Sequence, residues 1–164
     1  MKVGVSTSCL FPKPIEESLY QLAVNDVACA ELFLNTHSEL KKSFAHNMAK
    51  LLQRFEMCCP SVHPFTCEIE PLMFFSEYER RMNDILEYYK LYFQFMNIVG
   101  ANIFVFHGGK ADKGKEFYCE RYSRLYRLGK GKWFWRHHLL CGNGGAPCRR
   151  RCRQYDPARY RCTL

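Results

Sequence analysis

The sequence has no apolar run close to the roughly 20 residues that a membrane-spanning helix needs. It also lacks a basic start followed by a long apolar segment and a cleavage site, the pattern of a secretion signal. We therefore expect a cytoplasmic protein that has no membrane partner. With 164 residues, of which 48% are hydrophobic and 24% charged, the composition indicates one soluble globular domain and excludes general disorder.

The net charge is close to zero over most of the chain, although the whole chain carries +8. Residues 131–164 hold eight basic residues against a single acid, Asp156, whereas residues 1–130 are nearly neutral. Both tryptophans and four of the ten cysteines also lie after residue 130. This break in composition predicts a folded region over residues 1–129 and an irregular Arg/Cys/Gly-rich tail over residues 130–164.

The cysteines before residue 130 do not have the spacing of metal ligands. They fall within or beside apolar segments, and a chain of this length does not need disulfides to be stable. In a reducing compartment such cysteines behave as small hydrophobic residues. We therefore predict that these six are buried: Cys9, Cys29, Cys58, Cys59, Cys67 and Cys119.

Hydrophobic periodicity in residues 1–129 alternates between strand and helix. The predicted strands are Lys2–Thr7, Cys29–Leu34, Glu56–Val62 and Ala101–Phe106. Predicted helices follow them, starting near Pro14, Ser38, Ser76 and Lys115. Such alternation implies a parallel sheet, in either a doubly wound fold or a (β/α)8 barrel. The nucleotide-binding doubly wound fold loses its main support, because the sequence has neither a G-x-G-x-x-G motif nor a Walker loop.

Four segments together resemble one family: KVGVST, AELFLN, CCPSVHPF and NIFVFHGGK. In this order they resemble the sugar phosphate isomerase/epimerase family of xylose-isomerase-like TIM barrels, a superfamily that includes the endonuclease-IV-type nucleases. The resemblance covers residues 1 to about 129. It implies an α/β fold that is a partial (β/α)8 TIM barrel, with about four βα units followed by an irregular tail.

His63 and His107 are the strongest candidate site residues, because each follows a predicted strand at the barrel face that carries active sites. In the nuclease branch, the resemblance implies that both histidines bind metal. In the epimerase branch, it implies that they shape the sugar pocket, while Glu, Asp, His and Glu from the last four strands hold the metal. A hydrogen-bonded loop histidine is the alternative at either position.

Glu31 and Lys110 are weaker candidates for substrate binding. Glu31 lies within the second strand and could point into the barrel mouth, although an ion pair at the strand end is the favoured interpretation. Lys110 ends the segment Gly108-Gly109-Lys110, which could hold a phosphate through its backbone N–H groups and the ammonium. A plain turn with a solvated lysine is favoured there.

The resemblance also sets expectations for cofactor, partner and activity. The full-length family uses a divalent metal and acts on a sugar or sugar phosphate by abstracting a proton next to a carbonyl. The carboxylates expected from a fifth and later strands are missing after Gly129. We therefore expect a truncated, inactive fragment that binds no metal stably. The alternatives are a metal-dependent phosphodiesterase and a non-catalytic binding module with a basic tail.

Residues 130–164 show no helical or strand period, and their composition is typical of GC-rich coding sequence translated out of frame. We hypothesise a frameshift near residues 129–132, which sequencing of the gene would test. Three alternatives remain open: a zinc site with His137, His138 and the four tail cysteines, an arginine-rich nucleic-acid arm at residues 149–151, and a disordered tail. A nucleic-acid partner is not expected. Because a half barrel leaves strands 1 and 4 unpaired, we do expect self-association through the open sheet edges.

Overall fold

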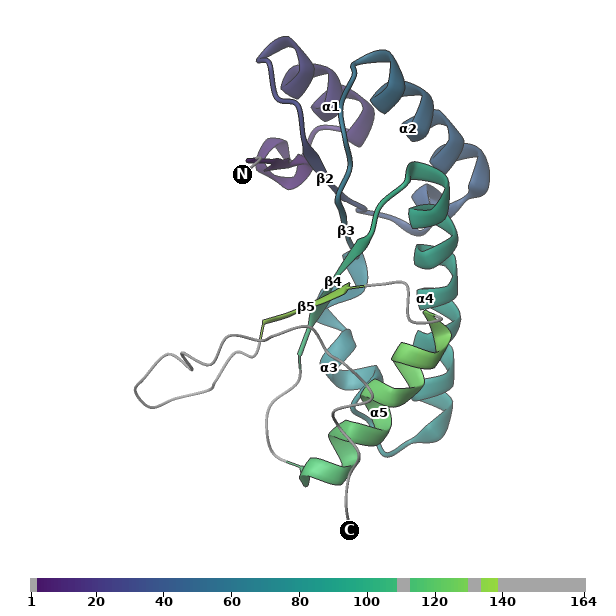
Figure 1. Cartoon of the computed structure of the whole chain (residues 1–164). Helices are drawn as coiled ribbons and strands as arrows, with labels where there is room; N and C mark the ends of the chain where they lie inside the picture. The colour runs from purple at the N-terminus through teal and green to yellow at the C-terminus, as the bar shows by residue number, and fades with distance from the viewer. Residues whose placement is uncertain (1–2, 109–112, 130–133, 139–164) are drawn as a thin grey trace.

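The computed structural model describes residues 3–108, 113–129 and 134–138, the last five by their backbone. Five parallel strands form one sheet in the order β1-β2-β3-β4-β5 (Figure 1). The strands are β1 Val5–Ser6, β2 Ala30–Phe33, β3 Ser61–His63, β4 Ile103–His107 and β5 Phe134–His138. Spatial order follows chain order, as it does in a barrel wall and not in a doubly wound sheet.

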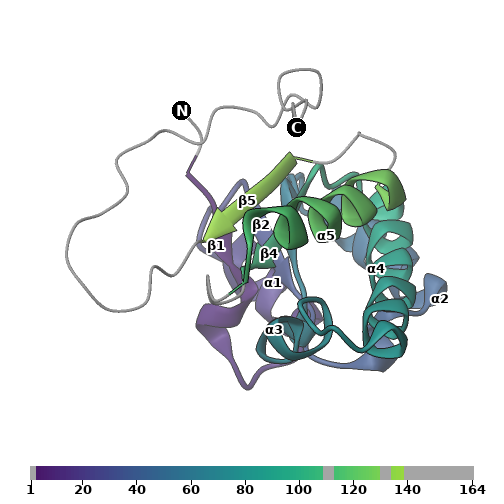
Figure 2. The same cartoon turned by 90° about the horizontal axis from the view of Figure 1, so that it is seen from below.

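Helices connect successive strands and form a single layer on one side of the sheet (Figures 1 and 2). The main helices are α1 Ile15–Val24, α2 Lys42–Arg54, α4 Glu79–Val99 and α5 Lys115–Leu128. Short 3-10 turns follow β1, β2 and β3 at Thr7–Leu10, His37–Leu40 and Phe65–Glu68, and one helical turn, α3, spans Glu70–Met73. The predicted partial barrel is confirmed: the strands form a curved wall, and the helices cover its outer side.

The two faces of the sheet differ in burial, because side chains alternate between faces along a strand. Leu32, Val62 and Phe104 point to the helices and are completely buried. Glu31 and His63 belong to the opposite face, which would line the interior of a barrel, and they are only partly buried. The inner face of the sheet is therefore only half covered in the part of the chain that the structure describes.

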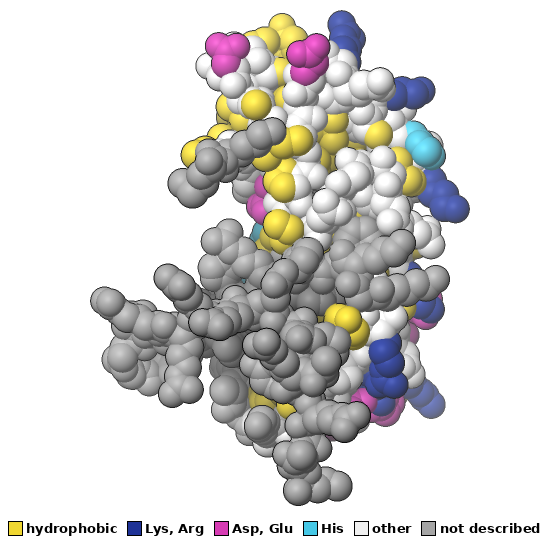
Figure 3. All heavy atoms as spheres, in the orientation of Figure 1, with side chains coloured by type: hydrophobic (Ala, Val, Ile, Leu, Met, Phe, Trp, Pro, Cys, Tyr) yellow, Lys and Arg dark blue, Asp and Glu magenta, His cyan; other side chains and the backbone are white. Residues whose placement is uncertain are grey.

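Some large apolar side chains remain exposed. On the side seen in Figure 3, apolar side chains reach the surface in the upper half of the molecule. The most exposed large hydrophobic residues are Val3, Phe11, Tyr20, Val24, Ile69, Leu72 and Tyr78. Among the described residues, no helix has the length and apolar composition that crossing a membrane would need.

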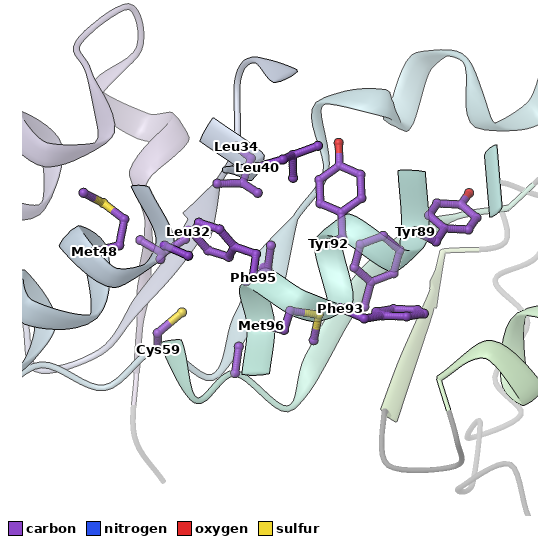
Figure 4. Close-up of a cluster of buried hydrophobic side chains, with 14 of the residues drawn as sticks. Leu32, Leu34, Leu40, Met48, Cys59, Tyr89, Tyr92, Phe93, Phe95 and Met96 are labelled. Carbon is purple, nitrogen blue, oxygen red and sulfur yellow. The ribbon is translucent and has the colours of Figure 1, made fainter. Parts of the chain in front are cut away.

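An aromatic cluster between α4 and β4 dominates the core (Figure 4). The rings of Tyr89, Tyr92 and Phe93 lie with their centroids 5.5 Å from that of Phe104. Edge-on and tilted contacts of this kind add to the free energy gained from burying apolar area. The helix ends at Val99, and Gly100 follows it with a φ of 77°, a value that favours glycine. The buried aromatic side chains of α4 therefore hold β4 in its place in the sheet.

The largest correction concerns residues 134–138. They were predicted to be irregular, but their backbone forms β5, which pairs in parallel with all of β4. The edge of β4 is therefore covered, and the outer strands of the sheet are β1 and β5. A strand at a sheet edge gains its hydrogen bonds from its neighbour, so it does not need a strand-like sequence of its own. Residues 130–133 and 139–164 lie outside the described residues, with the tail cysteines and the arginines at 149–151.

Two predicted helix starts are wrong by a few residues. Ser76 was expected to cap the long helix, but α4 begins at Glu79, and the Ser76 hydroxyl accepts a hydrogen bond from the backbone N–H of Tyr78 at 3.1 Å. Ser38 lies inside a 3-10 turn, and α2 begins only at Lys42. In both places a short polar side chain bonds locally in a turn and the helix follows later.

The prediction that all six earlier cysteines are buried is partly wrong. Cys29 and Cys59 are buried, whereas Cys9 and Cys58 are exposed and Cys67 and Cys119 are intermediate. The apolar segments around Cys58 placed it correctly near the start of a strand. They did not predict that the Cys58 side chain is exposed to solvent while that of Cys59 is buried.

Candidate functional site

The structure brings His63 and His107 together at the carboxyl ends of two neighbouring strands. His63 is the last residue of β3 and His107 the last residue of β4. Their ring centroids are 4.7 Å apart, with the rings nearly edge to face. On its other side His63 stacks on Phe33 of β2, at a centroid distance of 4.4 Å. The imidazoles are therefore held against a sheet wall rather than carried on a loose loop.

A buried carboxylate, Glu70, lies behind His107. Glu70 comes from the short helix α3 and is completely buried. Its Oε2 accepts a hydrogen bond from the backbone N–H of His107 at 2.9 Å and lies 3.7 Å from His107 Nδ1. Among the described residues, the other oxygen, Oε1, and His107 Nδ1 have no hydrogen-bond partner. Buried polar atoms are nearly always paired, so this arrangement is costly and points to a functional role.

The two histidines differ in their affinity for a proton. Glu70 raises the pKa of His107, mainly through its side-chain interaction with the ring. Burial lowers the pKa of His63, and the neighbouring His107 lowers it further. Burial also raises the pKa of the Glu70 carboxyl. Between the two pKa values, a protonated His107 therefore stands beside a neutral His63, one as a donor and the other as an acceptor.

Glu31 completes the inner face of this site. Its Oε2 accepts a hydrogen bond of 2.8 Å from the hydroxyl of Ser61 on the neighbouring strand. The predicted strand-end ion pair is wrong for the part of the chain that the structure describes, because no Lys, Arg or His lies within ion-pair distance of Glu31 there. The carboxylate still acts on the histidines, since its charge raises the pKa of both His63 and His107.

The remaining candidates lie outside the described residues or only partly inside them. Lys110 is not described, so both interpretations of its segment, the phosphate-binding role and the favoured plain turn, stay predictions. His137 and His138 end β5, and the backbone of His138 pairs in register with that of His107. Their predicted part in a zinc site also requires the tail cysteines, which lie outside the described residues.

The metal implied by the resemblance has no complete set of ligands here. Within residues 3–108 and 113–129, no group of three or more His, Cys, Asp or Glu side chains is arranged to hold an ion. His63, His107 and the nearby carboxylates supply suitable atom types, but a catalytic metal normally takes at least three protein ligands. We therefore derive no chemical step through a metal.

Sequence reasoning missed Glu70. Residues 66–75 were assigned to no helix or strand, and a single glutamate there belongs to no motif. The available signal was Glu70-Pro71, because an acid followed by proline is typical of the first turn of a helix. That signal predicts a helix start near residue 70. It does not predict that the carboxylate turns inward to His107.

Comparisons with known proteins bear on the fold. No protein-family model matches the sequence, and no curated protein matches it. Solved structures match well. One is a D-tagatose 3-epimerase-like protein, with a TM-score of 0.66 and 16% identity over 84% of this chain and 52% of the other. The chain has the fold of part of a xylose isomerase-like TIM barrel.

Two further solved structures have a similar fold. A xylose isomerase domain protein from Planctomyces limnophilus matches with a TM-score of 0.60 and 11% identity, over 84% of this chain and 51% of the other. A family 2 AP endonuclease from Brucella melitensis has the same TM-score and identity, and the match covers 84% of this chain and 55% of the other. The chain thus spans about half the length of the solved barrels that it matches.

Proposed function

We propose that this barrel segment is the substrate-binding half of a sugar isomerase/epimerase-type site. The observation that carries the proposal is the pair His63 and His107, held against Phe33 at the carboxyl ends of β3 and β4. Sugar hydroxyls both donate and accept hydrogen bonds, so a protonated and a neutral imidazole side by side suit them. The likeness to a D-tagatose 3-epimerase-like protein supports a ketose as the ligand.

Each residue has a defined part in this proposal. The aromatic face of Phe33 and the edge of His63 offer an apolar surface to the C–H groups of a sugar ring. Glu31 accepts hydrogen bonds from hydroxyl groups, as it does from Ser61. His107, backed by Glu70, holds a proton that it can donate to a sugar oxygen. A phosphate on the sugar would meet Lys110, which is a separate proposal for the segment after β4.

Turnover is not part of the proposed function of these 164 residues. Proton abstraction next to a carbonyl needs a carboxylate base and a group that stabilises the enolate oxygen. After residue 130 the sequence offers only Asp156 as an acid, and β5 contains none. The chain is therefore proposed to bind a sugar without interconverting it. Its cytoplasmic location also remains a proposal.

Ligand binding to the full chain tests the first part. Saturation-transfer NMR with D-tagatose should show transfer to the sugar protons, with millimolar affinity. The variant H63A/H107A should lose this transfer. The exposed His46 on α2 provides the matched control, since H46A removes an imidazole elsewhere and should leave transfer unchanged. Absence of transfer from the unmodified chain would refute sugar binding.

Product analysis tests the second part. The chain is incubated with D-tagatose and either Mg²⁺ or Mn²⁺, and the sugars are then separated by chromatography. We expect the starting ketose alone. Formation of an epimer or an aldose that disappears in H63A/H107A would contradict the absence of turnover, while leaving the assignment of the site intact.

A metal-dependent phosphodiesterase is the second candidate. It is favoured by the 4.7 Å approach of two histidine rings and by the likeness to a family 2 AP endonuclease. In that case Zn²⁺ should bind to the chain with an affinity that H63A reduces at least tenfold, and DNA containing an abasic site should be cleaved. Zn²⁺ binding unaffected by H63A would remove the support for this candidate. A binding role for the basic tail stays a prediction, because the tail lies outside the described residues.

A further inference from the structure

Two cysteine thiols face each other at the amino-terminal end of β2 and β3, away from the histidine pair. Cys29 directly precedes β2, and Cys58 lies three residues before β3. A parallel β-bridge joins the two residues across the strands. Their sulfur atoms are 3.0 Å apart, in the geometry of a hydrogen bond from the Cys58 thiol to Cys29 Sγ.

The backbone fixes this pair on both sides of Cys58. Its N–H donates to the carbonyl of Ala28, and its carbonyl accepts from the N–H of Ala30, both at 2.9 Å. Bridge partners on neighbouring strands lie about 4.8 Å apart, which is inside the Cα separation of about 4.4–6.8 Å found for disulfides. The two sulfur atoms can therefore bond after an approach of about 1 Å, with the strands in place.

Solvent reaches only one of the two cysteines freely. Cys58 is exposed, whereas Cys29 is buried beneath it. Gly4 packs closely against Cys29, since a Cβ at position 4 would lie 3.4 Å from Cys29 Sγ and 3.1 Å from its carbonyl oxygen. An oxidant can thus reach Cys58 first, and the 3.0 Å contact already places Cys29 Sγ beside Cys58 Sγ.

The neighbouring Cys59 does not compete for this chemistry. It is buried, and its thiol donates a hydrogen bond of 3.3 Å to the carbonyl of Ser61. Burial raises the pKa of this thiol to about 12. Because the thiolate is the reactive form, the buried Cys59 is a poor first nucleophile, whereas the exposed Cys58 can meet the oxidant.

We propose that Cys29 and Cys58 form a reversible disulfide that joins β2 to β3, with a low-molecular-weight disulfide as oxidant. Cys58 loses its proton to water, and its thiolate attacks one sulfur of the oxidant, whose S–S bond breaks and releases the first thiolate. That thiolate takes the proton of Cys29, and Cys29 Sγ then attacks Cys58 Sγ, which breaks the mixed disulfide and releases the second thiolate. The second thiolate takes up a proton from water, so the protein loses two electrons and two protons, and one disulfide is reduced to two thiols.

The bond would stabilise the barrel wall without occupying the proposed sugar site. It lies two residues before Glu31 on β2 and at the opposite end of the strands from His63. A disulfide that closes a loop of this length restricts the unfolded chain, so oxidation should raise the melting temperature by about 5–10 °C.

Oxidation of the full chain by oxidised glutathione tests the proposal. After the remaining thiols are blocked, proteolysis and mass spectrometry should identify a Cys29–Cys58 cross-link, and dithiothreitol should reverse it. C58S should abolish the cross-link together with the gain in melting temperature. C59A should retain both, which separates Cys58 from its neighbour.

Cys9 provides the matched control, because it is another exposed thiol before residue 130. C9S should leave the cross-link and the melting shift unchanged. The proposal is overturned if Cys58 accumulates as a stable mixed disulfide with glutathione, or if Cys29 is cross-linked to any other cysteine. Should C58S fail to fold, the cross-link map of the unmodified chain still decides between these outcomes.

Discussion

At the scale of single residues, the pairing of His107 with Glu70 decides the chemistry of the site. The carboxylate raises the pKa of His107, and burial lowers that of His63. Stabilisation by His107 is therefore present below pH 6.5 and is lost as the pH rises through its raised pKa. Stabilisation by neutral His63 is present above pH 6.5 and is lost as the pH falls through its lowered pKa.

The variant E70Q tests this pairing. Glutamine keeps an oxygen that can accept the backbone N–H of His107, but it removes the charge that favours the imidazolium. We expect the pKa of His107 to fall in E70Q, measured by NMR titration of the histidine ring protons. E16Q on the exposed surface of α1 should leave it unchanged. A pKa of His107 that does not move in E70Q would contradict the assigned role of Glu70.

At the scale of elements, Arg121 attaches α5 to the start of α4. It is 4% exposed and donates to Glu79 Oε1 at 3.0 Å and to the carbonyl of Ser76 at 2.9 Å. Its guanidinium also lies 4.8 Å from the ring centre of Phe117. The Arg121 side chain thus bonds to the turn that precedes α4 and to the first residue of α4. These contacts attach α5 to the rest of the helix layer.

Replacing Arg121 should loosen this attachment. We expect R121A to lower the free energy of unfolding by about 2 kcal/mol, because hydrogen bonds to a charged group and a cation–π contact are lost together. R127A is the matched control, since Arg127 is exposed on the same helix and, among the described residues, bonds only to the carbonyl of Ser123. Urea unfolding followed by circular dichroism measures both variants. If both variants lose the same free energy of unfolding, the buried contacts of Arg121 do not contribute more to stability than those of an exposed arginine.

The elements also show how far the sequence predicts the fold. β2, β4 and the main helices follow from hydrophobic periodicity, because their buried stripes are set by local spacing. The meeting of His63 and His107 follows from their places at strand ends. Two features could not be predicted in this way. Glu70 turns inward because the sheet places His107 beside it, and β5 forms because β4 offers an edge for pairing. Both depend on contacts between distant parts of the chain.

At the scale of the whole molecule, the structure is an open wall with an incompletely covered inner face. Its outer strands are β1 and β5, and open strand edges and exposed apolar residues favour self-association. The expected edge at strand 4 is covered, since β5 pairs with Ile103–His107 along its whole length. Self-association itself stays a prediction, and so does the frameshift near residues 129–132.

Two deletions separate the effect of β5 from that of the rest of the tail. Removing residues 139–164 keeps β5, so the edge of β4 stays paired. Removing residues 130–164 exposes the backbone groups of β4 and the aromatic β4 strand itself. We expect a larger weight-average mass for the second variant, measured by size-exclusion chromatography with light scattering at matched concentrations. It should also unfold at lower urea concentration, because β4 would lose its partner strand. If both variants have the same mass per chain and the same stability, then β5 does not protect this edge, and the barrel wall of this chain effectively ends at its fourth strand.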